Sequence, residues 1–151
     1  MLVKNVLLGA AALFAAASPA LASGYEITPI GEKGTYFGCT AINTETDVAF
    51  VAVGNTLSVM VTSKEFDVKK GDKVSGTWSV DGGKEHALEK TANGSGTVSS
   101  DMEPTKANFQ IIGDGKEMTV TVGKESMVFD MSGSQKALID LSACMNKISG
   151  K

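Results

Sequence analysis

The single histidine of the sequence is the first residue that could carry acid–base chemistry. His86 lies between Glu85 and Glu89, and a neighbouring carboxylate can orient an imidazole as a general base. No serine or cysteine in the sequence has the surroundings of an activated nucleophile, and exposed strand histidines are far commoner than catalytic ones. We therefore predict that no residue of this chain is catalytic and that the protein is not an enzyme.

The methionine sulfur atoms are the second group that could carry chemistry, as ligands of a soft metal. Met127 and Met131 fall on one face of a predicted strand together with Phe129, at a spacing that a copper site could use. The chain has few other ligands for a soft metal, and methionines that pack in a β core produce the same pattern. We expect neither a metal nor another cofactor.

The two cysteines, Cys39 and Cys144, stand near opposite ends of the chain. A redox pair or a metal site would need a close C-x-x-C spacing or further ligands, and the sequence has neither. In an oxidising compartment an even cysteine count favours an intramolecular disulfide. This bridge would close a loop of about 105 residues, worth about 4.7 kcal/mol in the chain-entropy estimate.

The oxidising compartment is itself predicted by the first 22 residues. Lys4 precedes an apolar run over residues 6–17, and Ala20, Leu21 and Ala22 match a small-x-small cleavage site. The run is shorter than the roughly 20 residues that span a bilayer, and Ser23 offers no thiol for lipid attachment. The sequence predicts a cleaved signal peptide over 1–22, a single mature domain over 23–151, no membrane insertion after cleavage, and a periplasmic or secreted location.

The charge of the chain restricts the classes of partner that we expect. Without the signal segment the chain has 13 basic residues, all lysine, against 17 acidic ones. A mildly acidic surface disfavours nucleic acid as a partner. The absence of arginine means that no guanidinium group can bind a carboxylate or a phosphate through two parallel hydrogen bonds. We expect a protein or envelope component as the partner.

Eight short apolar runs separated by glycine- and asparagine-rich turns predict strands. Their brief links favour antiparallel pairing. We place them at 35–42, 47–53, 56–63, 73–80, 84–91, 96–100, 117–122 and 126–131.

Alternation along these strands predicts one wet face and one buried face. Trp78 falls on the apolar side of its strand, which favours a core anchor over a ligand platform. The run 47–53 is apolar on both faces, so we expect a central strand that is covered on both sides. Of the adjacent aromatic residues Tyr36 and Phe37, we expect one to face outward, and we expect residues 23–34 to be an irregular lead-in.

Two segments lack the period-two alternation that is typical of strands. Residues 134–148 have an apolar helical stripe, and Ser132 with Gln135 has the pattern of a capping box. For residues 104–112, a short helix with Pro104 in its first turn and a strand fit nearly equally well. The predicted fold is a mainly β protein, an antiparallel β-sandwich or flattened barrel, with one C-terminal α-helix packed on it and closed by the disulfide.

Both ends of the mature chain resemble a known family. The opening Tyr36-Phe37-Gly38-Cys39, the stretch 129–134 (FDMSGS) and the helix segment 137–141 (ALIDL) with Cys144 are similar to small exported alphaproteobacterial β-proteins, in particular the invasion-associated locus B family. The resemblance implies a periplasmic or surface β-sandwich linked to host interaction, with no catalytic residues to carry over.

Taken together, these patterns predict an exported, non-catalytic binding or accessory protein acting in the envelope or in host interaction. The alternative is a proteinaceous inhibitor of an envelope-targeting hydrolase such as lysozyme. Asp81 and Asp114, in acidic glycine turns, would suit a basic enzyme. A small hydrolase is the third hypothesis.

Overall fold

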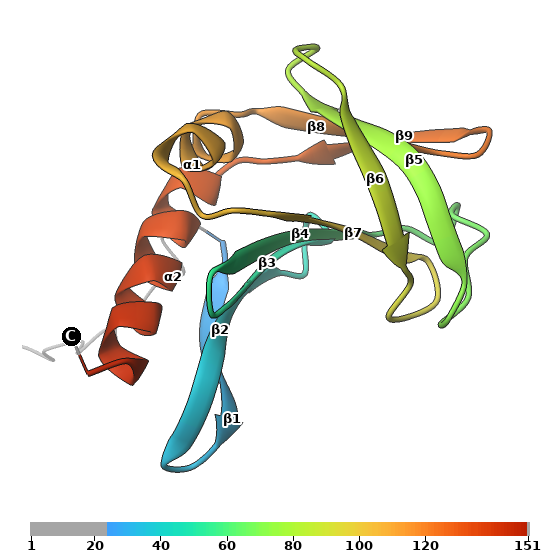
Figure 1. Ribbon diagram of the computed structural model, residues 1–151. Helices are drawn as coiled ribbons and strands as arrows, with labels where there is room; N and C mark the ends of the chain where they lie inside the picture. Colours follow the sequence, from blue (N-terminus) through green and yellow to red (C-terminus); the bar gives the residue numbers. More distant parts are fainter. Residues whose placement is uncertain (1–23, 151) are drawn as a thin grey trace, which may run out of the picture.

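The computed structural model describes residues 24–150, in which two antiparallel sheets pack face to face with two helices at one end (Figure 1). The predicted signal segment and its cleavage site lie outside the described residues. The first sheet has the strand order β1-β2-β3-β4-β7, with bounds Glu26–Glu32, Thr35–Asn43, Val48–Val53, Thr56–Thr62 and Thr97–Met102. The second has the order β6-β5-β8-β9, with bounds His86–Thr91, Lys73–Val80, Glu117–Val122 and Glu125–Asp130. The helices are α1 (Lys106–Gly113) and α2 (Ser134–Ile148).

All eight predicted strands are present, within one or two residues at most ends, and every pairing is antiparallel. The sandwich alternative of the predicted fold class is the one observed. The chain changes sheets between β4 and β5, between β6 and β7 and between β7 and β8, so β4 pairs with β7 and β5 pairs with β8. Local sequence does not encode these non-consecutive pairings.

The expectation of an irregular lead-in over 23–34 was wrong. Residues 26–32 form β1, which pairs with β2 along its whole length. Pro29 and Gly31 hid the strand because both residues are unusual inside sheets. Here they are tolerated because β1 is an edge strand and because the register shifts after Ile30, which leaves Phe37 as an extra residue on β2.

The inward faces of the two sheets form one core. It includes Phe50 and Leu57 from the first sheet and Trp78, Met118 and Val120 from the second, all buried. Trp78 is 6% exposed, and its indole N–H donates to the Ser100 hydroxyl across the sandwich at 3.0 Å. The core-anchor interpretation of Trp78 is confirmed.

The outward face of β3 is only partly covered, which corrects the expectation of a strand covered on both sides. β3 is central within its sheet, but Ala49 and Val51 on this face are half-buried and Val53 is exposed. The doubly apolar pattern therefore identified a central strand without identifying a second covering layer.

The helix α2 spans the predicted residues, but it begins differently. Gly133, with φ of 82°, is the N-cap, and no side chain caps the helix there, so the capping-box prediction was wrong. Instead the Ser134 hydroxyl donates to the carbonyl oxygen of Ile112 at 2.8 Å and ties α2 to α1. Residues 106–113 are helical, and α1 is capped by the Thr105 hydroxyl, which leaves Pro104 before the helix.

The predicted disulfide joins α2 to the first sheet. Cys39 and Cys144 are bonded, with 6.3 Å between their Cα atoms and a sequence separation of 105. Leu138 and Leu141 lie on the inner side of α2 and are buried. The prediction that the C-terminal helix packs on the β-sandwich is therefore confirmed. Within residues 24–150, neither helix has the length and apolar character needed to cross a membrane.

A candidate binding groove between the hairpin and the terminal helix

The space between the two sheets is filled by side chains. The residual cavity there measures about 10 Å³ and lies among Trp78, Leu88 and Ser100, whereas a single water needs roughly 10 to 15 Å³. An interior of this kind has no room for an organic ligand. A binding site in the described part of the chain therefore has to lie on its outside.

A spacious outer hollow lies where the β1–β2 hairpin meets the C-terminal half of α2. We call it the hairpin–helix groove. Its volume is about 780 Å³, compared with about 340 Å³ and 230 Å³ for two hollows beside α1. Ligand pockets typically measure about 300 to 1,000 Å³. The hairpin wall consists of Pro29, Gly34, Thr35 and Tyr36, and the helix wall consists of Cys144, Lys147 and Ile148.

Two different constraints hold the walls of this groove. The disulfide fastens the helix wall to β2, where Cys39 is fully buried, while Cys144 remains half-buried and faces the groove. On the hairpin, a side chain at Gly31 would place its Cβ 2.3 Å from the carbonyl oxygen of Thr35, and its φ is 134°. The groove is therefore framed before any ligand arrives, which reduces the ordering cost of binding.

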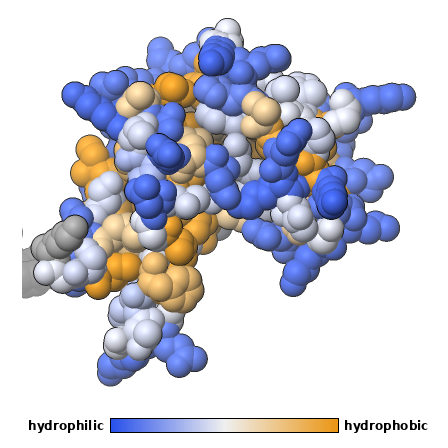
Figure 2. Space-filling view, viewed as in Figure 1, coloured by the Kyte–Doolittle hydropathy of each residue, from blue (hydrophilic) through white to orange (hydrophobic). Residues whose placement is uncertain are grey.

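The hairpin exposes aromatic surface beside the groove. Tyr36 is 41% exposed and Phe37 is 58% exposed, so the expectation that only one of them faces outward was wrong. The bulge places Phe37 out of register with β1, and the hairpin extends past the body of the sandwich (Figure 1). Apolar residues gather on the surface where the hairpin and the base of α2 meet (Figure 2).

Lys147 is the one charged residue among the groove's lining residues. It lies in the last turn of α2, where a cation also compensates the partial negative charge of the helix end. Glu32 and Lys33, at the hairpin tip, are exposed. The groove is therefore an apolar surface with one cation at its side.

His86 has a structural role. Its ring stacks on the indole of Trp78, with centroids 4.2 Å apart and planes inclined by 16°. Glu85 and Glu89 are exposed, and no hydrogen bond found in residues 24–150 links either of them to His86. The histidine that we considered as a general base thus forms a stacked pair with the core residue Trp78.

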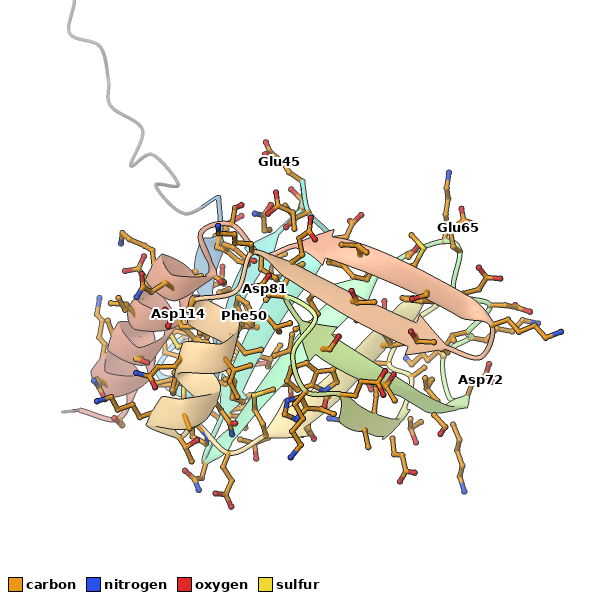
Figure 3. The ribbon with its side chains drawn as sticks, turned by 90° about the horizontal axis from the view of Figure 1, so that it is seen from above. Glu45, Phe50, Glu65, Asp72, Asp81 and Asp114 are labelled. Atoms are coloured by element: carbon orange, nitrogen blue, oxygen red, sulfur yellow. A yellow bond between two sulfur atoms is a disulfide. The ribbon has the colours of Figure 1, made fainter. Side chains whose placement is uncertain are left out.

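The methionines considered for a copper site lie in the core or pack against it. Met131 is fully buried, and Phe129 and Met127 belong to or pack against the same hydrophobic core, which matches the interpretation as core methionines. Asp72 accepts a backbone hydrogen bond from Lys69 at 2.9 Å. It lies at the opposite end of the molecule from Asp81 and Asp114 (Figure 3).

The two acidic turns considered for an inhibitor have folding roles. The carboxylate of Asp81 accepts hydrogen bonds from the backbone N–H groups of Lys116 and Glu117, at 2.9 to 3.2 Å, and Asp81 itself has φ of 51°. Asp114 is the C-cap of α1. The Asp81 carboxylate therefore stabilises the local backbone, whereas Asp114 caps α1 through its backbone N–H, which donates to the Gln110 carbonyl at 2.9 Å, and its side chain is exposed.

A separate polar cluster lies at the junction of β4, β6 and β7. The carboxylate of Asp101 accepts hydrogen bonds from Lys90 and from Ser58. Burial of Asp101 opposes ionisation, but the hydrogen bonds from Lys90 and Ser58 outweigh it, so the pKa of this carboxyl lies below its ordinary value. Lys90 forms an ion pair with Asp101 that links β6 and β7, the edge strands of the two sheets. The cluster therefore stabilises the packing of one sheet on the other.

Comparison with known proteins supports the fold. No family model matches the sequence, and no curated protein matches it. Among solved structures, the chain is similar to invasion associated protein B from Bartonella henselae, with a TM-score of 0.53, 18% sequence identity, and coverage of 82% of this chain and 94% of that one. The resemblance predicted from the two ends of the chain thus extends over most of the fold, and this protein has the same fold as invasion associated protein B.

Proposed function

We propose that this chain is an exported, non-catalytic binding or accessory protein that holds an envelope or host component in the hairpin–helix groove. The observation that carries the proposal is the groove itself, which is about 780 Å³ in volume and is lined by the exposed Tyr36. Phe37, the next residue of the hairpin, is also exposed. Large exposed aromatic side chains beside a preformed groove are typical of recognition surfaces.

Export is supported by two independent features. The first 22 residues have the charge, apolar run and cleavage pattern of a signal peptide, and the Cys39–Cys144 bridge is of a kind that persists in oxidising compartments. The invasion-related name of the structural neighbour agrees with a role in the envelope or in host interaction.

Export is tested by mass spectrometry of the protein recovered from a periplasmic fraction. We expect its N-terminus at Ser23, because cleavage follows the small-x-small site. A periplasmic protein that retains Met1 would contradict the signal assignment.

Binding is tested by placing a photo-crosslinking amino acid at Phe37. The matched control is the same substitution at Val128, which is also 58% exposed but lies on β9, outside the groove. We expect a discrete envelope or host component to be captured from position 37 and not from position 128. Identical capture patterns from the two positions would contradict the groove as the binding surface.

Inhibition of a hydrolase such as lysozyme has weaker support. Of the two acidic residues named for it, the Asp81 carboxylate is already hydrogen-bonded to two backbone N–H groups, which leaves Asp114 as the exposed one. Pull-down with a basic lysozyme separates the two functions, because the inhibitor hypothesis requires stoichiometric capture.

A further inference from the structure

We propose that the hairpin–helix groove binds a single-chain amphiphile with an anionic head, of the long-chain carboxylate class. This inference rests on the proposed function and names the chemistry of the ligand. It follows from three properties of the groove: few hydrogen-bonding groups, one unopposed cation, and the volume of a lipid-sized pocket.

The scarcity of hydrogen-bonding groups excludes the polar ligand classes. Pro29 has no backbone N–H, and the side chains of Tyr36 and Ile148 present mainly hydrocarbon. Apart from the Lys147 ammonium, the lining side chains offer only the hydroxyl groups of Thr35 and Tyr36, which are few for a ligand as polar as a sugar or a nucleotide. A hydrocarbon tail needs none, and its burial is favourable in proportion to the apolar area removed from water.

Charge complementarity selects the head group. The ammonium of Lys147 is the only charge among the lining residues, and no carboxylate lines the groove, although the chain as a whole has more acidic than basic residues. One full positive charge exceeds the roughly half negative charge of a helix C-terminus. A monoanion is therefore favoured over a neutral or cationic head.

The geometry places the two parts of such a ligand. The head would lie beside Lys147 in the last turn of α2, and the tail would lie along Tyr36 and Pro29 on the hairpin wall. The disulfide keeps the two walls at a constant separation because Cys144 belongs to the helix wall.

The test is a calorimetric titration of the oxidised, exported protein with octanoate, decanoate and laurate, each kept monomeric. We expect saturable binding of one molecule, tightening by up to about fourfold for each added methylene that is buried. Backbone NMR shifts should change over residues 34–36 and 144–148. Binding without chain-length dependence, or shifts confined to other residues, would overturn the proposal.

A second experiment tests whether binding requires the positive charge of Lys147. Lys147→Gln should weaken laurate binding by up to about fivefold, while Lys124→Gln, in the turn between β8 and β9, should leave it unchanged. Dodecyltrimethylammonium should not displace laurate. Equal affinity for the cationic amphiphile, or an unchanged affinity in Lys147→Gln, would overturn the anionic assignment.

Two further outcomes separate this inference from the proposed function. Absence of laurate binding together with specific crosslinking from Phe37 would refute the amphiphile while leaving the binding function standing. A dimer in light scattering that laurate does not dissociate, and whose formation depends on Phe37, would show that a second copy occupies the groove, which also overturns the inference.

Discussion

Tyr25 anchors the beginning of the described chain in the core. It is 2% exposed and stacks on Phe50, with ring centroids 5.3 Å apart. Burial raises the pKa of its phenol to about 12, a hydrogen bond with Thr46 lowers it, and the nearby charge of Asp130 raises it further. Tyr25 is the second described residue, so the described chain is part of the core packing almost from its beginning.

This raised pKa predicts a loss of stability at alkaline pH. The unfolded chain releases the phenolic proton near pH 10 and the folded chain near pH 12, so between these values the folded state binds more protons and stability falls as pH rises. Two pKa units correspond to about 2.7 kcal/mol. In urea unfolding from pH 9 to 12, wild type should lose about 2 kcal/mol more free energy of unfolding than Tyr25→Phe, because the folded phenol is only half ionised at pH 12. Parallel pH profiles for the two proteins would contradict this origin.

Ser132 and Ser134 allow a matched comparison at the start of α2. The Ser134 hydroxyl is buried and donates to the Ile112 carbonyl, so Ser134→Ala should lower the free energy of unfolding by about 1 kcal/mol. Ser132 is exposed, and its alanine variant should change stability by less than about 0.5 kcal/mol. Denaturant titration measures both variants, and the reverse order would restore the capping-box interpretation.

At the scale of elements, the helix α2 has two structural roles. Its inner side completes the core with Leu138 and Leu141, and its C-terminal half forms one wall of the groove through Cys144, Lys147 and Ile148. The helix α1 contacts α2 through the Ser134–Ile112 hydrogen bond, so the two helices form one unit at the end of the sandwich (Figure 1).

The buried side of α2 can be tested against its exposed side. Leu141 is 1% exposed and Ile139 is 61% exposed. Truncation of a buried leucine typically costs about 2 to 5 kcal/mol, so Leu141→Ala should lower the melting temperature in both the oxidised and the reduced protein. Ile139→Ala is the control and should have little effect. Equal melting temperatures for Leu141→Ala and wild type in both redox states would contradict the docked helix.

At the scale of the whole molecule, the disulfide closes nearly the entire described chain into one loop. With a sequence separation of 105 between its cysteines, the bridge acts mainly by restricting the unfolded chain, at about 4.7 kcal/mol in the chain-entropy estimate. Packing under α2 is a separate contribution, which remains when the bridge is reduced.

Cys144→Ser separates these contributions. Oxidised wild type should melt well above the variant, whereas reduced wild type and the variant should melt at nearly the same temperature, because only the oxidised chain carries the loop constraint. Differential scanning calorimetry with and without reductant measures this. Free-thiol labelling of the native protein should find neither Cys39 nor Cys144 reactive, and stoichiometric labelling would mean that the bridge is absent.

Local pattern was sufficient for most elements of this protein. Period-two alternation and glycine turns located β2 to β9, and an apolar helical stripe located α2, because both signals arise between residues close in sequence. The pairing of Cys39 with Cys144 followed from there being only two cysteines. The same local reasoning missed β1, whose proline and glycine are acceptable only at a sheet edge.

The groove could not be read from the sequence because it is made by segments more than a hundred residues apart. Tyr36 and Phe37 stood out beside Cys39, but their joint exposure depends on a register shift in the hairpin. The sequence alone determined the alternating strands, the terminal helix and the covalent bridge. Only the tertiary structure decided that Tyr36 and Lys147 line one hollow, since that depends on long-range packing for which local periodicity has no signal.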